Sequence, residues 1–189
     1  MTRLSRQDIV IGAGKRFATH GYHGTSMRDL GDDLGIVGSS IYAHVGGKQE
    51  LLLSVIERGA ALFEASSANA VASHDEPRAR LRSLIEGHVD VLVDHEAESR
   101  TFLNEAAFLD AGERDRVTAI RDAYERVFRE TISAGVVSGA FRSDVDPKIS
   151  WIFILSMLNA TQRWYHADGE ISRAGLVQQL HHFAISGLR

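Results

Sequence analysis

The 189 residues are 44% hydrophobic and 24% charged, as in a globular protein long enough to bury a core. The absence of cysteine excludes disulfides, zinc–thiolate sites and thiol catalysis. The formal net charge is −4, but residues 1–48 hold six Lys or Arg against four Asp. A basic N-terminal segment therefore precedes an acidic remainder, which permits a nucleic-acid-binding head.

Targeting and membrane signals are missing from the sequence pattern. The segment from Met1 to Ser5 has no apolar stretch typical of a signal peptide. The longest strongly apolar run, Trp151–Leu155, is far shorter than a membrane span. We expect a cytoplasmic protein.

Capping and glycine patterns predict three N-terminal helices. The first begins at Ser5, with Asp8 completing a capping-box-like start, and ends near Gly21. The second begins at Ser26 with Asp29 three residues later, and Gly35 ends it after two turns. A third short helix is expected at about 39–44.

Helical periodicity continues through the rest of the chain, and no convincing strand interrupts it. A helix near 147–165, opened by the segment from Asp144 to Pro147, is apolar on nearly all faces and must be covered on both sides. The sequence predicts an all-α protein of about nine helices, the others lying at about 48–72, 77–94, 96–110, 113–138 and 172–187. The last helix is expected to present one apolar stripe formed by Leu176, Leu180, Phe183, Ala184 and Leu188.

Residues 25–52, TSMRDLGDDLGIVGSSIYAHVGGKQELL, resemble the DNA-binding signature of the TetR/AcrR repressors. Two short helices joined by a glycine-containing turn form a helix-turn-helix, whose second helix lies in the major groove. The sequence departs from the family pattern at Val37, where a Ser or Thr cap is usual, at Val45, where an aromatic is usual, and at Gly12 and Gly14, where Ala or Leu is common. The predicted DNA-contacting residues are Thr25, Ser26, Arg28, Ser39, Ser40, Tyr42, His44 and Lys48.

The side-chain types of these residues suggest different contacts with DNA. Tyr42, His44 and Lys48 suit phosphates, because a hydroxyl, an imidazole and an ammonium can donate to them. Ser39 and Ser40 are small enough to let the recognition helix sit deep in the groove. Arg28 is the candidate for a base-edge contact. Packing of Tyr42 on a neighbouring helix, an exposed His44 without a DNA role and an Arg28–Asp32 pair are the alternatives.

The resemblance also implies an effector pocket enclosed by the fifth to eighth helices and a homodimer that pairs the eighth and ninth helices. We expect residues 1–48 to form the DNA-binding domain and 49–189 the effector-binding and dimerisation domain. The residues proposed to line the pocket are mostly apolar with a few polar groups, a composition equally typical of an ordinary helical core. The candidate lining comprises Leu84, His88, Leu92, Phe102, Asn104, Glu105, Phe108, Tyr124, Phe128 and Trp151.

The segment Arg163-Trp164-Tyr165, followed by Gly169, resembles a subgroup of repressors that respond to acyl-coenzyme A thioesters. Arg163 would then meet a phosphate and Trp164 would stack on the adenine. The alternative is that Trp164 and Tyr165 anchor a dimer interface. The expected function is a ligand-responsive DNA-binding repressor, with operator DNA, a second copy and a small effector as its partners.

Nucleotide binding, catalysis and metal binding have less support in the sequence than DNA binding. Gly12 to Lys15 suggests a phosphate loop but lies inside a predicted helix, and no Gly-x-Ser-x-Gly elbow is present. His88, His95 and the His181–His182 pair could bind a metal, although hydrogen-bonded or pocket-lining roles are the simpler interpretation. We expect neither an enzyme nor a cofactor. The alternative class is a helical small-molecule-binding or adaptor protein with a vestigial head.

Overall fold

A computed structural model describes residues 4–189, and all of its regular structure is helical. The all-α prediction with about nine helices is confirmed. Met1 to Arg3, including the Arg3 counted in the basic head, lie outside the described residues. The elements found between residues 4 and 189 are α1 (Arg6–His20), α2 (Met27–Leu34), α3 (Gly38–Ile41), α4 (Lys48–Ser73), α5 (Pro77–Asp94), α6 (Glu96–Asn104), η1 (Ala106–Phe108), α7 (Ala111–Val137), α8 (Pro147–Ala160), η2 (Thr161–Arg163) and α9 (Arg173–Leu188).

Capping fixes the starts of the first two helices as predicted. The Ser5 hydroxyl accepts the Asp8 N–H at 3.2 Å, and the Asp8 carboxylate accepts the Ser5 N–H at 2.8 Å. Ser26 and Asp29 repeat this reciprocal arrangement at the start of α2. Each box satisfies two backbone N–H groups that a helix start leaves without partners.

Three helices are shorter than predicted because their last turns tighten into i→i+3 hydrogen bonds. The predicted helix at 96–110 ends at Asn104, after which the Phe108 N–H donates to Glu105 at 3.0 Å. The predicted helix at 147–165 ends at Ala160 and continues only as η2. The third helix spans Gly38–Ile41, and Ala43 and His44 follow it in turns.

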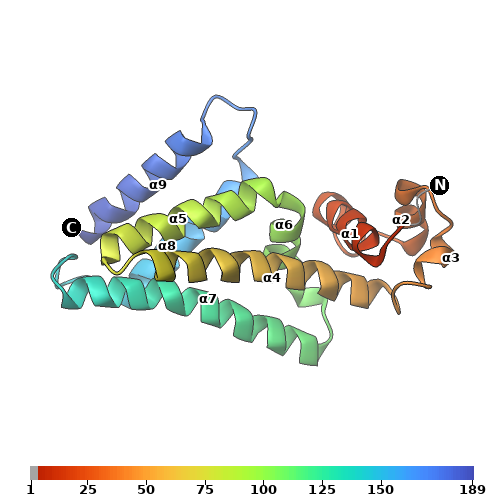
Figure 1. Ribbon diagram of the computed structural model, residues 1–189, viewed down its shortest axis with the longest axis horizontal. Coiled ribbons are helices and arrows are strands. Elements are labelled where there is room, and N and C mark those ends of the chain that lie inside the picture. Colours follow the sequence, from red (N-terminus) through yellow and green to blue (C-terminus); the bar gives the residue numbers. More distant parts are fainter. Residues whose placement is uncertain (1–3) are drawn as a thin grey trace. The chain divides into compact units, whose positions relative to one another are not determined.

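The chain divides into two compact units, each with its own core, and the division falls inside α4 and inside α7. The first unit comprises the chain up to Ala61 together with His95–Ala119. In it α1 packs on α2 and on α6, and α2 packs on α3 (Figure 1). Its core contains the fully buried side chains of Ile9, Phe17, Leu30, Ile41, Leu51 and Leu52.

The second unit comprises Leu62–Asp94 and Ile120–Arg189. Here α5 packs against both α8 and α9, and α8 packs against α9 (Figure 1). Its core includes Phe63, Leu81, Leu84, Ile85, Phe128 and Leu158. Over residues 4–189, no helix combines the length and hydropathy that a membrane crossing requires.

Candidate functional site

The corner between α2 and α3 depends on two glycines that let the helices approach. A Cβ at Gly31 would lie 2.7 Å from the Gly38 nitrogen and 2.7 Å from the Ile36 carbonyl oxygen. A Cβ at Gly38 would lie 2.9 Å from the Met27 carbonyl oxygen. Between them, Gly35 ends α2 in the left-handed region with φ 67° and ψ 27°. This geometry is that of a helix-turn-helix.

A surface groove follows this corner and includes several of the predicted DNA-contacting residues. Arg28 on α2, Ser39 on α3 and Tyr42 just after α3 all line it. Tyr42 is 56% exposed, which favours the predicted phosphate contact over the alternative that its side chain is packed against a neighbouring helix. Arg28, Ser39 and the adjacent Ser40 are also exposed.

Ion pairing in the head involves a different arginine from the predicted alternative. Arg16 pairs with Asp33 at 2.7 Å and with Asp29 at 3.6 Å. The described residues contain no Arg28–Asp32 ion pair within 4.0 Å. The Arg28 guanidinium is therefore available at the surface, while Arg16 neutralises acidic side chains of α2.

The remaining residues predicted to contact DNA differ in how exposed their side chains are. Thr25 is buried, and its hydroxyl donates to the Gly21 carbonyl at 3.0 Å, which turns this side chain inward. Ser26 is exposed and caps α2. His44 is half-buried in the turn after α3. The DNA contacts of Thr25, Ser26 and His44 stay predictions.

Lys48 occupies the first position of α4, and its ammonium lies 4.1 Å from the centre of the Tyr22 ring. Partial burial lowers the pKa of Lys48. The Phe108 ring also stacks on Tyr22, with the ring centroids 5.9 Å apart. The aromatic contact orients the Lys48 side chain at a helix N-terminus, where free N–H groups favour anions.

Most of the predicted effector residues in the second unit are buried together around an aromatic cluster. Leu84, His88, Leu92 and Phe128 have little or no exposed surface. The His88 Nδ1 atom lies 2.9 Å from the Tyr124 hydroxyl in a buried hydrogen bond. Burial lowers the pKa of His88 to about 3, and a hydrogen bond with the Asn159 side chain partly opposes this shift. Burial likewise raises the pKa of Tyr124.

Four predicted effector residues belong to the first unit. Glu105 accepts the Tyr22 N–H at 2.8 Å, and Phe108 contacts Tyr22 and His23. Asn104 is exposed and donates to the Arg100 carbonyl, whereas Phe102 is buried. The geometry thus assigns Glu105 and Phe108 to holding the segment after α6 against the turn after α1. Their role in effector binding stays a prediction.

The candidate nucleotide-binding residues lie at the end of α8. Arg163 ends η2 and is exposed, and Trp164 follows it with 49% of its surface exposed. The Trp164 ring meets Tyr165 edge-on at 6.4 Å. Trp151, at the start of α8, is half-buried.

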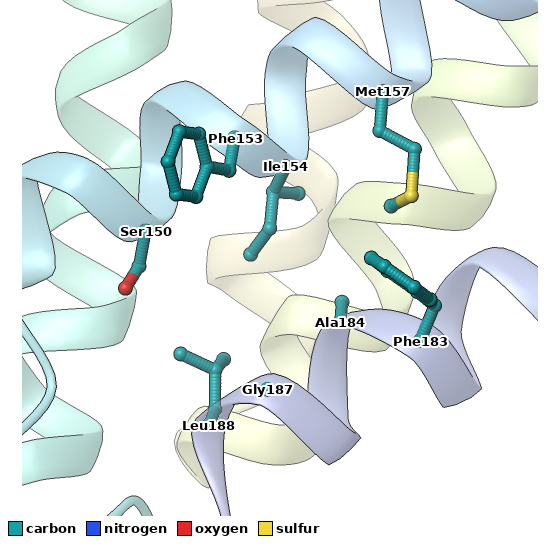
Figure 2. Close-up of a pocket in the computed structure, with 8 residues that line it drawn as sticks. All are labelled: Ser150, Phe153, Ile154, Met157, Phe183, Ala184, Gly187 and Leu188. Carbon is teal, nitrogen blue, oxygen red and sulfur yellow. The ribbon is translucent and has the colours of Figure 1, made fainter.

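An apolar groove between α8 and α9 was not predicted as a pocket, although both helices were expected to pair across a dimer axis. Phe153 is 69% exposed and Phe183 is 71% exposed. Figure 2 shows Met157 and Phe183 pointing toward one another across this groove. The complete lining is Ser150, Phe153, Ile154, Met157, Phe183, Ala184, Gly187 and Leu188.

The predicted apolar stripe of α9 requires one correction. Leu176, Leu180, Ala184 and Leu188 recur every four residues and are buried within the chain. Phe183 does not share their environment and is exposed. The buried face of α9 also includes Val177 and Ile185, so its centre is turned away from Phe183.

Two other residues matter for the site but were missed by sequence reasoning. Asn159 on α8 affects the ionisation of His88, and Phe63 on α4 packs 4.9 Å from the His88 ring. Helical periodicity could have placed Asn159 near the buried face of α8. It gives no indication, however, that a histidine on another helix lies beside it. In the described part of the chain, no group of three or more His, Cys, Asp or Glu side chains is placed to hold a metal ion.

Comparison with known proteins agrees with this geometry. Residues 9–55 match the family described as "Bacterial regulatory proteins, tetR family", and residues 74–188 match "Tetracyclin repressor-like, C-terminal domain". The transcriptional repressor KstR2 of Rhodococcus jostii is 24% identical over 184 residues, covering 97% of this chain and 90% of its own length.

Solved structures show the same fold. The TetR-family regulator PfmR from Thermus thermophilus superimposes with a TM-score of 0.87 at 29% identity, covering 96% of this chain and 98% of its own. AibR in complex with isovaleryl coenzyme A and operator DNA gives a TM-score of 0.85 at 24% identity, covering 97% of each chain. The function is thus regulatory rather than enzymatic, and the chain belongs to the TetR family of bacterial transcriptional regulators.

Proposed function

We propose that this chain is a repressor that leaves its operator when a small amphipathic molecule binds. The observation that carries the proposal is the exposed groove at the α2–α3 corner, where Arg28, Ser39 and Tyr42 share one surface. Its residues offer a guanidinium and two hydroxyls to DNA. The repressor name of the KstR2 relatives supports the direction of regulation. Such a regulator acts where bacterial DNA lies, in the cytoplasm.

In this proposal, residues 1–48 form the DNA-binding domain and α3 enters the major groove. Arg28 reads a base edge, because its guanidinium is exposed and forms no ion pair with Asp32. Tyr42 and Lys48 bind phosphates and set the register of the head on the duplex. The Tyr22 ring holds the Lys48 ammonium in place for this contact.

Residues 49–189 provide dimerisation and effector binding. The apolar groove of α8 and α9 supports an isologous dimer, because two copies related by a two-fold axis would cover each other's exposed phenylalanines (Figure 2). Phe153 and Phe183 are the large apolar side chains of this groove that would lose most exposed surface in such a contact. Each fully buried side chain of this kind contributes roughly 1.5–3 kcal/mol.

An acyl-CoA thioester is the effector that we favour. Exposed Arg163 suits a phosphate and exposed Trp164 suits an adenine ring, while the buried aromatic cluster of the second unit suits an acyl tail. The isovaleryl coenzyme A bound by AibR, a neighbour in fold, is a ligand of this class. Binding releases DNA only if the ligand prefers the DNA-incompetent state.

The test begins with DNA fragments that the protein selects from its source genome. The repressor–fragment complex is titrated with thioesters of increasing chain length, with free coenzyme A and free fatty acids as controls. Affinity should rise by about 0.8 kcal/mol per buried CH₂ until the site is filled. Arg163→Ala should weaken the response to thioesters, and Arg142→Ala provides a matched control at another exposed arginine of the same unit.

Two results would reject the effector assignment. One is that no thioester releases the DNA, and the other is that Arg163→Ala responds as the wild type does. Failure to select any DNA fragment would instead reject the repressor proposal and favour a small-molecule-binding or adaptor role.

A further inference from the structure

The helix α6 and the segment after it belong to the same compact unit as the DNA-binding helices. Within this unit α6 packs on α1 (Figure 1). A Cβ at Gly59 of α4 would lie only 2.6 Å from the Glu98 carbonyl oxygen of α6, so these two backbones are in direct contact. The neighbouring Arg58 pairs with the Glu98 carboxylate at 3.3 Å. The backbone of α6 is therefore held against both α1 and α4.

The segment from Glu105 to Phe108 joins the turn after α1 to the first turn of α4. The Glu105 carboxylate accepts the Tyr22 N–H at 2.8 Å. The Phe108 ring stacks on the Tyr22 ring with an angle of 16° between the ring planes. The Phe108 carbonyl accepts a hydrogen bond of 2.9 Å from the side-chain amide of Gln49, the residue directly after Lys48.

The position of the Lys48 ammonium depends on the Tyr22 ring, which lies 4.1 Å away at its centre. The acidic side chain nearest to Lys48 in the sequence, Glu50, pairs instead with Arg6 at 3.0 Å. A lysine side chain has many rotamers, and it loses that freedom when it binds a fixed phosphate. Because the Phe108 ring stacks on Tyr22, it restricts the ring that restrains the ammonium.

We propose that Phe108 and Glu105 are positioning residues for the phosphate contact of Lys48, and that they act through Tyr22. This inference rests on the proposed function, in which Lys48 binds a phosphate. It extends the residues that determine DNA affinity beyond the proposed DNA-binding domain of residues 1–48. A lysine whose ammonium is already in place loses less rotamer freedom on binding, so removal of either support weakens DNA binding although no DNA-contacting charge is lost.

The test is a double-mutant cycle on the full-length protein, with a DNA fragment that the wild type selects and fluorescence anisotropy as the measurement. Phe108→Ala and Glu105→Ala are each made in the wild type and in a Lys48→Ala background. Each should weaken DNA binding about two- to fivefold when Lys48 is present. Neither should weaken it further in the Lys48→Ala background, because a support for the ammonium acts only through that ammonium.

Two further variants separate positioning from a general loss of stability. Phe108→Tyr keeps a ring that can stack on Tyr22, so it should restore the affinity that Phe108→Ala loses. Leu103→Ala removes a half-buried apolar side chain of the same unit, and any change that it causes in affinity should be equal in the two backgrounds. Thermal unfolding defines a temperature at which every variant is folded during the titrations.

A second measurement follows the Lys48 side chain without DNA. Lysines occur only at positions 15, 48 and 148, so isotope-labelled methyl groups on the lysines give a simple NMR spectrum. The ring current of Tyr22 should shift the Lys48 methyl signal upfield in the wild type, since the ammonium lies over the ring. In Phe108→Ala that signal should move toward those of Lys15 and Lys148, which are exposed.

The outcomes separate this inference from the proposed function. The positioning role would be overturned by unchanged affinity in Phe108→Ala and Glu105→Ala, by an equal loss in both backgrounds, or by a Lys48 signal that Phe108→Ala leaves in place. Each of these results would leave the phosphate contact standing. A Lys48→Ala protein that binds DNA as the wild type does would instead overturn the phosphate contact itself, and the positioning role with it.

Discussion

Replacing Gly31 by alanine tests whether the helix-turn-helix depends on direct backbone contact between α2 and α3. The added methyl would lie 2.7 Å from both the Gly38 nitrogen and the Ile36 carbonyl oxygen, and 2.8 Å from the Gly38 Cα. All three are backbone atoms, so no rotamer change can relieve the clash. Instead α3 must move away from α2.

The expected cost follows from two opposing effects. Overpacking a well-packed site costs about 1–3 kcal/mol, whereas alanine in place of glycine within a helix gains up to about 1 kcal/mol. We expect a net loss of about 1–2 kcal/mol. For a domain of this size that corresponds to a melting temperature roughly 2–8 °C lower. Operator affinity should fall further, because a displacement of about 0.5 Å already exceeds what a binding surface tolerates.

The measurements are thermal unfolding and fluorescence anisotropy with a DNA fragment selected by the wild type. Gly112→Ala is the control, because this glycine also lies in a helix but a Cβ there would meet nothing within 4 Å. It should leave both stability and DNA affinity unchanged or slightly higher. A Gly31→Ala protein as stable and as tightly bound as the wild type would refute the reasoning.

Three further predictions concern the dimer, the phosphate contacts and a helix cap. Phe183→Glu should yield a helical monomer in sedimentation, since Phe183 is 71% exposed in the single chain, and a persisting dimer would argue against the α8–α9 interface. Lys48→Ala should weaken binding to all sequences and make the slope of log affinity against log salt shallower by about one unit per lost contact; an unchanged slope would remove Lys48 from the interface. Hydrogen bonds from the Ser26 hydroxyl and N–H lower the pKa of Asp29. Its charge therefore stabilises the fold above the ordinary carboxyl pKa of 3.8, and this contribution is lost as the pH falls through the lowered value. Asp29→Asn should lower the melting temperature at pH 7, with a gap that narrows below pH 3.8; a gap independent of pH would contradict this assignment.

The sequence was sufficient for the helical elements and the DNA-binding motif because their signals are local. Ser26 and Asp29 specify a helix start within four residues, and Gly35 specifies its end. Periodicity likewise identified the buried face of α9, since Leu176 and Leu180 are one turn apart. Such patterns need no knowledge of the partner helix.

Contacts between helices that are distant in the sequence could not be predicted from such local patterns. The hydrogen bond from the Tyr22 N–H to the Glu105 carboxylate joins residues 83 positions apart, and no local pattern predicts it. Asn159 was overlooked because only the packing of α5 and α8 brings it near His88. The exposure of Phe183 could not be predicted from the stripe either, because the extent of the buried face depends on α5 and α8, which pack against α9.

The central claim is that a dimer of this chain binds a specific operator and releases it when an effector binds. Its most direct test is light scattering of the protein with a selected genomic fragment, with and without the thioester that binds best. The account predicts two chains, or a multiple of two, on each duplex and free DNA once the thioester is added. A single chain per duplex, or a complex that forms equally on unrelated DNA and survives saturating thioester, would contradict it.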